Sequence, residues 1–226
     1  MLALTPDLLL CAYASGLFPM ANDRHDPTIH WIEPRRRGVL PLDAFHQPRS
    51  LRRLIRRQLF EVHVDRAFGA VIEACAEPRP ERPRTWLNDD LIALYCALHR
   101  QGYAHSIETW AGGRLVGGLY GVSLGAAFFG ESMFSHRRDA SKVALVALVE
   151  RLRAGGYLLL DTQFVTDHLK RFGAIEISRE SYQRQLQRAL ETPAVFYSEA
   201  GAVGSTTPWS LSGAATGSSQ STTQTS

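Results

Sequence analysis

The spacing of apolar residues switches along the chain between a helical period and the alternation typical of strands. Repeats at three- and four-residue intervals, bounded by capping residues, predict helices. They cover the stretch between Thr5 and Gly16 and residues 49–58, 67–76, 89–100, 140–154, 165–171 and 180–190. Alternating or short buried runs predict strands at 29–32, 38–42, 60–65, 104–110, 114–124, 126–133, 157–161 and 174–177. The Ala-Gly-Gly turn at 111–113 should join two of these strands in a hairpin.

The order of the predicted elements indicates an α+β fold. From residue 60 it is β-α-α-β-β-β-α-β-α-β, an alternation over a mostly antiparallel sheet that resembles acyltransferases of the GNAT type. Order alone is a fold analogy and assigns no chemistry. From Gly201 to Ser226 there is no charged residue, and 17 of 26 residues are Ser, Thr or Gly, which predicts a disordered tail.

Composition places the chain among ordinary globular proteins. It has 226 residues, of which 45% are hydrophobic and 21% charged, and no apolar run approaches the ~20 residues of a membrane-spanning helix. The N-terminus lacks the basic residues of a secretory signal, because the first Lys or Arg is Arg24. Three cysteines (Cys11, Cys75 and Cys96) without metal spacing favour a reducing compartment, so we expect a cytoplasmic protein.

Charge changes this picture because its distribution is uneven. The net charge is +3, but only Lys142 and Lys170 of the 25 basic residues are lysines. Eight arginines lie between Arg35 and Arg57 against a single acid, Asp43. Guanidinium groups pair with phosphate in a fork, which makes a nucleic-acid backbone a candidate partner. An arginine-rich genome and a solvated helix face would explain the same charge equally well.

Three polar residues at strand ends are candidates for chemistry. Glu131 stands between Gly130 and Ser132 where a strand closes, a place that can line a cleft. Asp161 and Gln163 are two residues apart, so on a strand their side chains would share one face and could meet one ligand. The alternatives are equally common: a salt-bridged acid at 131, a helix cap at 161 and a loop hydrogen bond at 163.

Apolar and aromatic residues near these strands could form a binding wall. They are Phe128, Phe129, Met133, Phe134, Leu145, Leu148 and Leu152, although ordinary core is the stronger interpretation of such residues. Trp31 and Trp86 lie outside periodic segments and could stack on a nucleobase, or be partial core. The glycines from Gly117 to Gly121 imply a close neighbour, either backbone or ligand. The histidines share no spacing that would suit zinc.

A set of short motifs resembles the leucyl/phenylalanyl-tRNA–protein transferases of bacteria over nearly the whole chain, from Leu8 to about Leu190. The matching strings are Gly16-Leu-Phe-Pro-Met20, Trp31-Ile-Glu-Pro34, Arg37-Gly-Val-Leu-Pro-Leu42, Thr85-Trp-Leu87, Gly102-Tyr-Ala-His-Ser-Ile-Glu108, Leu115-Val-Gly-Gly-Leu-Tyr-Gly121, Gly130 to Ser135, Asp139-Ala-Ser-Lys142, Leu160-Asp-Thr-Gln163 and Asp167-His-Leu169. Two strings depart from the family: His30-Trp31 replaces a Trp-Trp pair, and His46-Gln-Pro-Arg-Ser50 has a proline in place of a hydroxyl residue.

The resemblance implies an aminoacyltransferase that moves Leu or Phe, and less well Met, from aminoacyl-tRNA to the N-terminal Arg or Lys of a protein, marking it for degradation. It implies a small N-terminal domain (1–59) packed on a GNAT-like domain (60–197), with the tail at 198–226, acting as a monomer without metal or coenzyme.

The resemblance also implies roles for the candidate residues. Gln163, polarised by Asp161, would hold the attacking amine, and Glu131 would attract the cationic acceptor. The expected contacts to aminoacyl-adenosine are Trp31, Trp86, Phe128, Met133, Leu145, Leu148 and Leu152. The expected contacts to the tRNA backbone are Arg49, Arg52, Arg53 and Arg56.

Two rival functions are weaker. An acetyl-CoA-dependent acyltransferase needs a glycine-rich turn for pyrophosphate, and the stretch from Ser135 to Lys142 has no glycine. A non-catalytic RNA-binding module would explain the arginines but not Glu131, Asp161 and Gln163.

Overall fold

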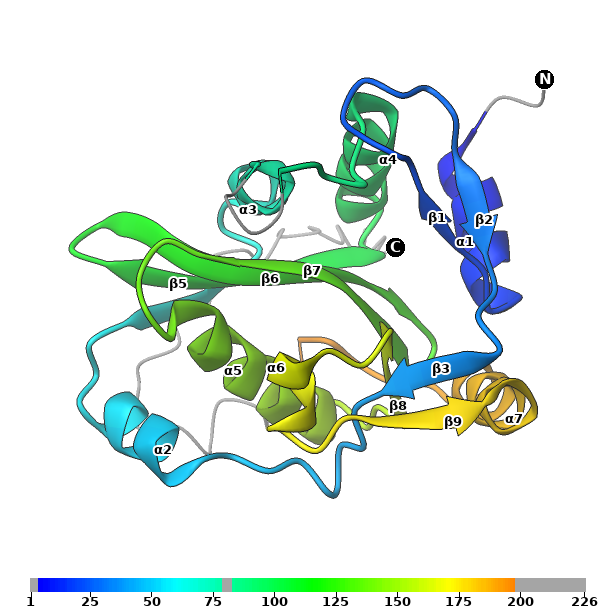
Figure 1. Ribbon diagram of the computed structural model, residues 1–226. Helices are drawn as coiled ribbons and strands as arrows, with labels where there is room; N and C mark the ends of the chain where they lie inside the picture. Colours follow the sequence, from blue (N-terminus) through cyan, green and yellow to red (C-terminus); the bar gives the residue numbers. More distant parts are fainter. Residues whose placement is uncertain (1–3, 79–82, 198–226) are drawn as a thin grey trace, which may run out of the picture.

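The computed structural model describes residues 4–78 and 83–197. Its centre is a seven-stranded sheet with the order β4-β5-β6-β7-β8-β3-β9, beside a two-stranded antiparallel sheet, β1-β2 (Figure 1). Among the described residues the only parallel pair of the large sheet is β7–β8; the other neighbours are antiparallel. The fold is therefore mixed α/β, and the expectation of a mostly antiparallel sheet is confirmed at this level.

Most element bounds follow the sequence pattern, but the strand predicted at 38–42 begins and ends earlier in the chain, and the one predicted at 157–161 begins and ends later. The strands are β1 (Phe18–Met20), β2 (His30–Ile32), β3 (Arg36–Val39), β4 (Glu61–Val64), β5 (Ala104–Ala111), β6 (Arg114–Leu124), β7 (Ala127–Ser135), β8 (Leu159–Gln163) and β9 (Ile175–Ser178). The helices are α1 (Pro6–Ala14), α2 (Arg49–Arg56), α3 (Phe68–Ala76), α4 (Asp89–Arg100), α5 (Ala140–Ala154), α6 (Asp167–Lys170) and α7 (Arg179–Leu190).

Helices cover both faces of the large sheet. One hydrophobic core joins the sheet to α1, α3, α4 and α7, and a second lies under α2, α5 and α6. Figure 1 shows α3 and α4 on one side of the sheet and α5, α6 and α2 on the other. This sandwich buries β8 and the first half of β7, while the residues from Gly130 to Met133 are only partly buried.

Local signals predicted most helix boundaries. Thr5 and Asn88 cap α1 and α4 through their side chains, as expected. The sequence also predicts Asp139 as the cap of α5, but its backbone is left-handed (φ 66°) and its carboxylate instead pairs with Lys142 at 2.5 Å. The sequence did not predict β1, because a three-residue strand centred on Pro19 gives no alternation.

The glycines of β6 are explained by protein packing. A Cβ on Gly117 would lie 2.5 Å from the Cβ of Ala140 at the start of α5. A Cβ on Gly121 would lie 2.3 Å from the carbonyl oxygen of Phe129 on β7. The sequence left open whether these glycines make room for protein or for a ligand, and the structure shows that protein atoms are the close neighbours.

The segment 1–59 contributes to both sheets. It forms the small sheet and also supplies β3, which lies between β8 and β9 in the large one. The tail at 198–226, predicted to be disordered, lies outside the described residues, as do residues 79–82. No helix within 4–78 and 83–197 has the length and apolar character needed to cross a membrane.

Candidate active site

A cavity of about 580 Å³ opens at the ends of β7 and β8. One wall comes from β1 and Trp86, the middle from Glu131 and Gln163, and the opposite wall from α5 and α6. The apolar residues that line it include Phe18, Met20, Leu119, Met133, Phe134, Leu145, Leu148, Leu160 and Leu169. The cavity is therefore a largely apolar chamber with a small polar centre, which is typical of a ligand site.

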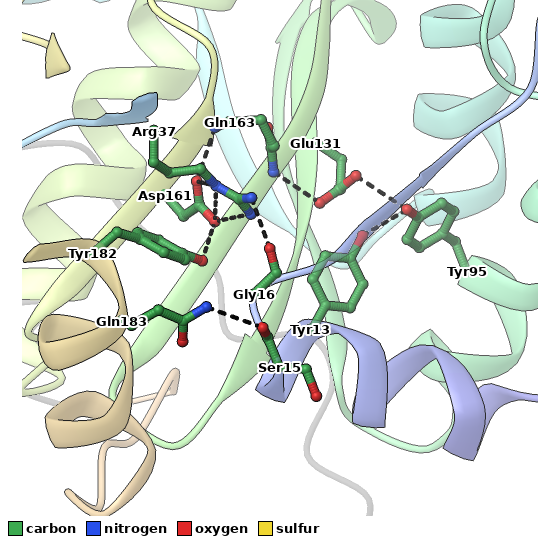
Figure 2. Close-up of polar contacts among 10 residues, drawn as sticks. All are labelled: Tyr13, Ser15, Gly16, Arg37, Tyr95, Glu131, Asp161, Gln163, Tyr182 and Gln183. Carbon is green, nitrogen blue, oxygen red and sulfur yellow. Dashed lines mark hydrogen bonds and ion pairs between the residues drawn. The ribbon is translucent and has the colours of Figure 1, made fainter. Parts of the chain in front are cut away.

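Asp161 lies beside this cavity and does not line it. The carboxylate is fully buried and forms an ion pair with Arg37 of β3, with Nη2 2.6 Å from Oδ2 and Nε 2.9 Å from Oδ1. The Tyr182 hydroxyl of α7 donates a further hydrogen bond to Oδ2 at 2.7 Å (Figure 2). Asp161 is thus an anion with donors on both oxygens, which a buried carboxylate requires.

Gln163 ends β8 with a left-handed backbone at φ 55°. Its backbone N–H donates to Asp161 Oδ1 at 2.8 Å, and its side-chain Nε2 donates to Glu131 Oε1 at 3.1 Å. A non-glycine residue rarely adopts this conformation, so the surrounding contacts must hold it. Figure 2 shows the amide pointing from the strand end toward Glu131.

This backbone turn changes the predicted relation between Asp161 and Gln163. Regular strand geometry would place both side chains on one face. Instead Gln163 lines the cavity, and Asp161 turns to Arg37 and Tyr182. Asp161 accepts from the Gln163 backbone, and Glu131 is the acid that contacts the side-chain amide.

Glu131 of β7 is the carboxylate that faces the cavity. It accepts from Gln163 and, at 3.0 Å, from the Tyr95 hydroxyl of α4, which in turn lies 2.6 Å from the Tyr13 hydroxyl of α1. Burial, opposed by the hydrogen-bonding tyrosines, raises the pKa of Glu131 to about 7. A carboxylate that titrates near neutral pH in a cavity suits a functional site.

The structure brings only part of the predicted aminoacyl-adenosine set together. Trp86, Met133, Leu145 and Leu148 line the cavity. The remaining three lie outside its lining: Phe128 and Leu152 are fully buried in the core under α5, and Trp31 is 37% exposed on β2. Leu152 follows Leu148 by one helical turn. The apolar face of α5 therefore extends beyond the cavity, and its residues there pack in the hydrophobic core.

The four predicted tRNA contacts lie together on α2. Arg49, Arg52, Arg53 and Arg56 are all exposed, and this helix contains no acidic residue. Leu51 is the buried anchor of the helix, and α2 packs against α5. The four guanidinium groups therefore form a cationic face on the α5 side of the sheet.

Sequence reasoning missed Arg37, Tyr13, Tyr95 and Tyr182. The tyrosines occupy apolar periodic positions of their helices, which are typical of core residues. Arg37 belongs to an arginine-rich stretch and resembles a solvated charge. The strand predicted at 38–42 did not include Arg37, and in the structure Arg37 lies inside β3.

Cofactor residues are not evident in the described part of the chain. No group of three or more His, Cys, Asp or Glu residues there is arranged to hold a metal ion. The polar groups of the cavity are instead a carboxylate, an amide and hydroxyls, which suit an organic ligand.

Comparisons with known proteins agree along the length of the chain. The family model described as leucyl/phenylalanyl-tRNA protein transferase matches residues 39–187, and the model of its N-terminal domain matches residues 3–35. A solved C-terminal DUF2156 domain from Agrobacterium fabrum is 13% identical, with a TM-score of 0.42, and the match covers 81% of this chain and 62% of that one.

Curated proteins named leucyl/phenylalanyl-tRNA–protein transferase are close in sequence. One from Paramagnetospirillum magneticum is 60% identical over 85% of this chain and 92% of its own length. One from Caulobacter vibrioides is 60% identical over 89% of this chain and 94% of its own, and one from Cereibacter sphaeroides is 59% identical over 87% and 90%. The chain therefore belongs to the leucyl/phenylalanyl-tRNA protein transferase family.

Proposed function

We propose that the cavity beside Glu131 and Gln163 is the acyl-transfer site of an enzyme that moves leucine or phenylalanine from aminoacyl-tRNA to a protein. The family match supports the reaction, and the geometry supports the site. Among the described residues, this cavity joins a largely apolar lining to a carboxylate and an amide at the ends of two strands. The GNAT-like character of residues 60–197 is part of the proposal, supported by α5 connecting the parallel neighbours β7 and β8.

The reaction is the attack of an amine on an ester. A C–N bond forms at the aminoacyl carbonyl, the C–O bond to the terminal ribose breaks, and the ribose oxygen takes up a proton as the amine loses one. An α-amine with a pKa of about 7.7–8.0 is partly neutral at cellular pH, so no strong base is needed. Holding amine and ester together can supply roughly 7–11 kcal/mol at best.

Gln163 is suited to hold the attacking amine. Its Nε2 donates a hydrogen bond to Glu131, and this fixes which end of the amide faces the carboxylate, because a carboxylate can only accept. The amide oxygen is then the group left to accept an N–H of the amine. Glu131 fixes the orientation of this amide and adds negative charge near the approaching acceptor terminus.

The donor side chain would occupy the apolar wall of α5. Leu145 and Leu148 are three residues apart on one helix face and meet Met133 of β7 in the lining. Leu, Met and Phe are unbranched at Cβ, whereas Ile and Val are stiff there. A deep apolar chamber beside the ester would therefore favour the first group, and Trp86 on the β1 side would stack on the terminal adenine.

The acceptor and the tRNA body complete the proposal. We infer that the acceptor is a protein with N-terminal Arg or Lys, since a cationic side chain suits the anionic Glu131. The exposed arginines of α2 would contact the tRNA backbone. We further infer that the protein acts in the cytoplasm, where both substrates are available. We infer that it acts as a monomer, because one chain supplies the whole cavity.

The observation that carries this function is the hydrogen bond from Gln163 to Glu131 inside the cavity. The test is to incubate the purified chain with radiolabelled Leu-tRNA and a peptide that starts with Arg. We expect label on the peptide, and none on the same peptide with a blocked α-amine. Absence of transfer with both Leu-tRNA and Phe-tRNA would overturn the proposal.

A further inference from the structure

Arg37 lies where four separate parts of the chain meet. It belongs to β3 and contacts Asp161 of β8 through two nitrogens, while its Nη1 donates to the Gly16 carbonyl oxygen at 2.8 Å. The guanidinium also lies over the rings of Phe18 of β1 and Tyr182 of α7, 4.7 Å and 4.5 Å from their centroids. Figure 2 shows Arg37 with Asp161, Tyr182 and Gly16 around it.

The charges of Arg37 and Asp161 are both buried. Arg37 is 1% exposed and Asp161 is fully buried, so each charge depends on the other for compensation. Asp161 occupies only part of the guanidinium of Arg37. The rings of Phe18 and Tyr182 cover its faces, and the Gly16 carbonyl oxygen accepts the hydrogen bond from Nη1. The pair therefore has one well-defined geometry.

That geometry is transmitted to the cavity through the strand end. Asp161 Oδ1, fixed by Arg37 Nε, accepts the backbone N–H of Gln163. This bond holds Gln163 in the left-handed conformation that turns its side chain toward Glu131. We infer that Arg37 and Asp161 form a positioning unit that aims the Gln163 amide and acts on the reaction without touching substrate; this rests on the proposed function.

The alternative is that the negative charge of Asp161 itself assists the reaction. The two cases differ when both charges are removed together. Asn at 161 keeps an oxygen that can accept the Gln163 N–H, and Gln at 37 can donate to that Asn. Gln is shorter than Arg and loses the contacts of Nη1 and Nη2, but its amide nitrogen falls at the position of Arg37 Nε, so the neutral pair keeps this donor and abolishes the charge.

The experiment measures kcat and KM for Leu transfer with Arg37→Gln, Asp161→Asn and the double variant. We expect each single change to lower kcat by tenfold or more with a smaller effect on KM, because each leaves an unpaired buried group. The double variant should recover at least tenfold relative to the worse single variant. A double variant no better than Asp161→Asn would overturn the inference.

A pH profile reports separately how far the two charges of the pair act on Glu131, so that this effect can be told apart from the loss of positioning seen in kcat. The groups facing Glu131 are Tyr13, Tyr95, Arg37 and Asp161, with Tyr182 next to Asp161. Arg37 lowers the pKa of Glu131 and Asp161 raises it. The acid limb should move to higher pH in Arg37→Gln, to lower pH in Asp161→Asn, and back toward its original position in the double variant.

Two further variants keep the test decisive. Arg37→Lys retains the charge without the fork, and should lower kcat while leaving the acid limb in place, which covers the case of an unfolded double variant. Arg24→Gln removes more exposed ion pairs to Glu73 and Asp89 and should change neither readout. Absence of transfer in the unmodified protein would refute the proposed function, whereas normal transfer there with an unchanged kcat in Arg37→Gln, Arg37→Lys and Asp161→Asn would refute only the positioning unit.

Discussion

Two largely buried acidic clusters in this protein look alike but differ in what their oxygens face. In one, Asp65 accepts from His105 at 2.7 Å, from the backbone of Ser106 at 2.6 Å and from the Tyr197 hydroxyl. In the other, Glu131 accepts from Tyr95 and Gln163. Both clusters are built from a carboxylate and its donors, yet only the second lines the cavity.

Their electrostatics diverge accordingly. Burial alone would raise the pKa of Asp65, but the hydrogen bonds and charge of His105, with Tyr197 and Ser106, outweigh it and lower that pKa. For Glu131 burial prevails and raises the pKa to about 7. Both oxygens of each acid accept protein donors, so the difference is that Glu131 also lines the cavity and can meet a ligand, whereas Asp65 acts as a brace between segments. Burial and charge alone do not mark the functional site.

The largest expected effect separates the two clusters directly. Gln163→Ala should lower single-turnover transfer by about 100-fold or more with little loss of stability, because it removes a group that acts in the transition state. Asp65→Asn should do the reverse, lowering the melting temperature by about 4–8 °C for a loss of about 2 kcal/mol, with near-normal transfer. Rates and thermal unfolding of both variants check this; equal rate losses would erase the distinction.

A second test uses tryptophans inside and outside the cavity. Trp86 lines it, while Trp110 donates to Glu108 at 2.9 Å next to the Asp65 cluster. Trp86→Ala should weaken binding of a minimal aminoacyl-adenosine about 5- to 150-fold, since a stacking ring contributes ~1–3 kcal/mol. Trp110→Ala is the matched control and should leave that affinity unchanged. Trp31→Ala, measured alongside, decides whether the ring on β2 also reaches the nucleotide.

A third test compares neighbouring turns of α5. Leu148 lines the cavity and Leu152 lies in the core one turn later. Leu148→Ala should shift donor preference from Leu toward Phe by roughly tenfold, within the ~1–3 kcal/mol of apolar discrimination. Leu145→Phe makes the pocket smaller and should therefore lower the rate with the Phe donor more than the rate with the Leu donor. Leu152→Ala should lower stability and keep the parental ratio, so a shift there instead would move the pocket deeper along the helix.

The smallest effect concerns the surface of α2. Charge reversal at Arg52, Arg53 or Arg56 should reduce the slope of log affinity against log salt by about 0.7–0.9 for each phosphate that the arginine neutralises. Reversal of Arg184 and Arg188, which are exposed on α7, is the control. Titrations of tRNA at several salt concentrations measure the slopes, and identical slopes for both sets would make α2 an ordinary solvated helix.

The sequence predicted those features that depend on residues close together in the chain. Periodicity predicted α4 and α5 at their observed bounds. Glu131 and Gln163 stood out because polar residues are unusual at buried strand ends. The pair of Arg37 with Asp161 could not be predicted, since it joins residues 124 positions apart. The left-handed Gln163 also depends on that long-range pair, so the site geometry is a property of the assembled sheet.

The central claim, that Glu131 and Gln163 work together at the acyl-transfer site, is tested most directly by the pH dependence of single-turnover transfer. Between about pH 5 and 7 two protonations should slow the reaction: the acceptor amine gains a proton, and Glu131, with its pKa near 7, loses its charge and its hold on Gln163. The log of the rate should therefore fall with a slope approaching two below about pH 6.5. In Glu131→Gln only the amine titrates, so the slope should be near one, with a lower plateau. The same slope in both proteins would contradict the account.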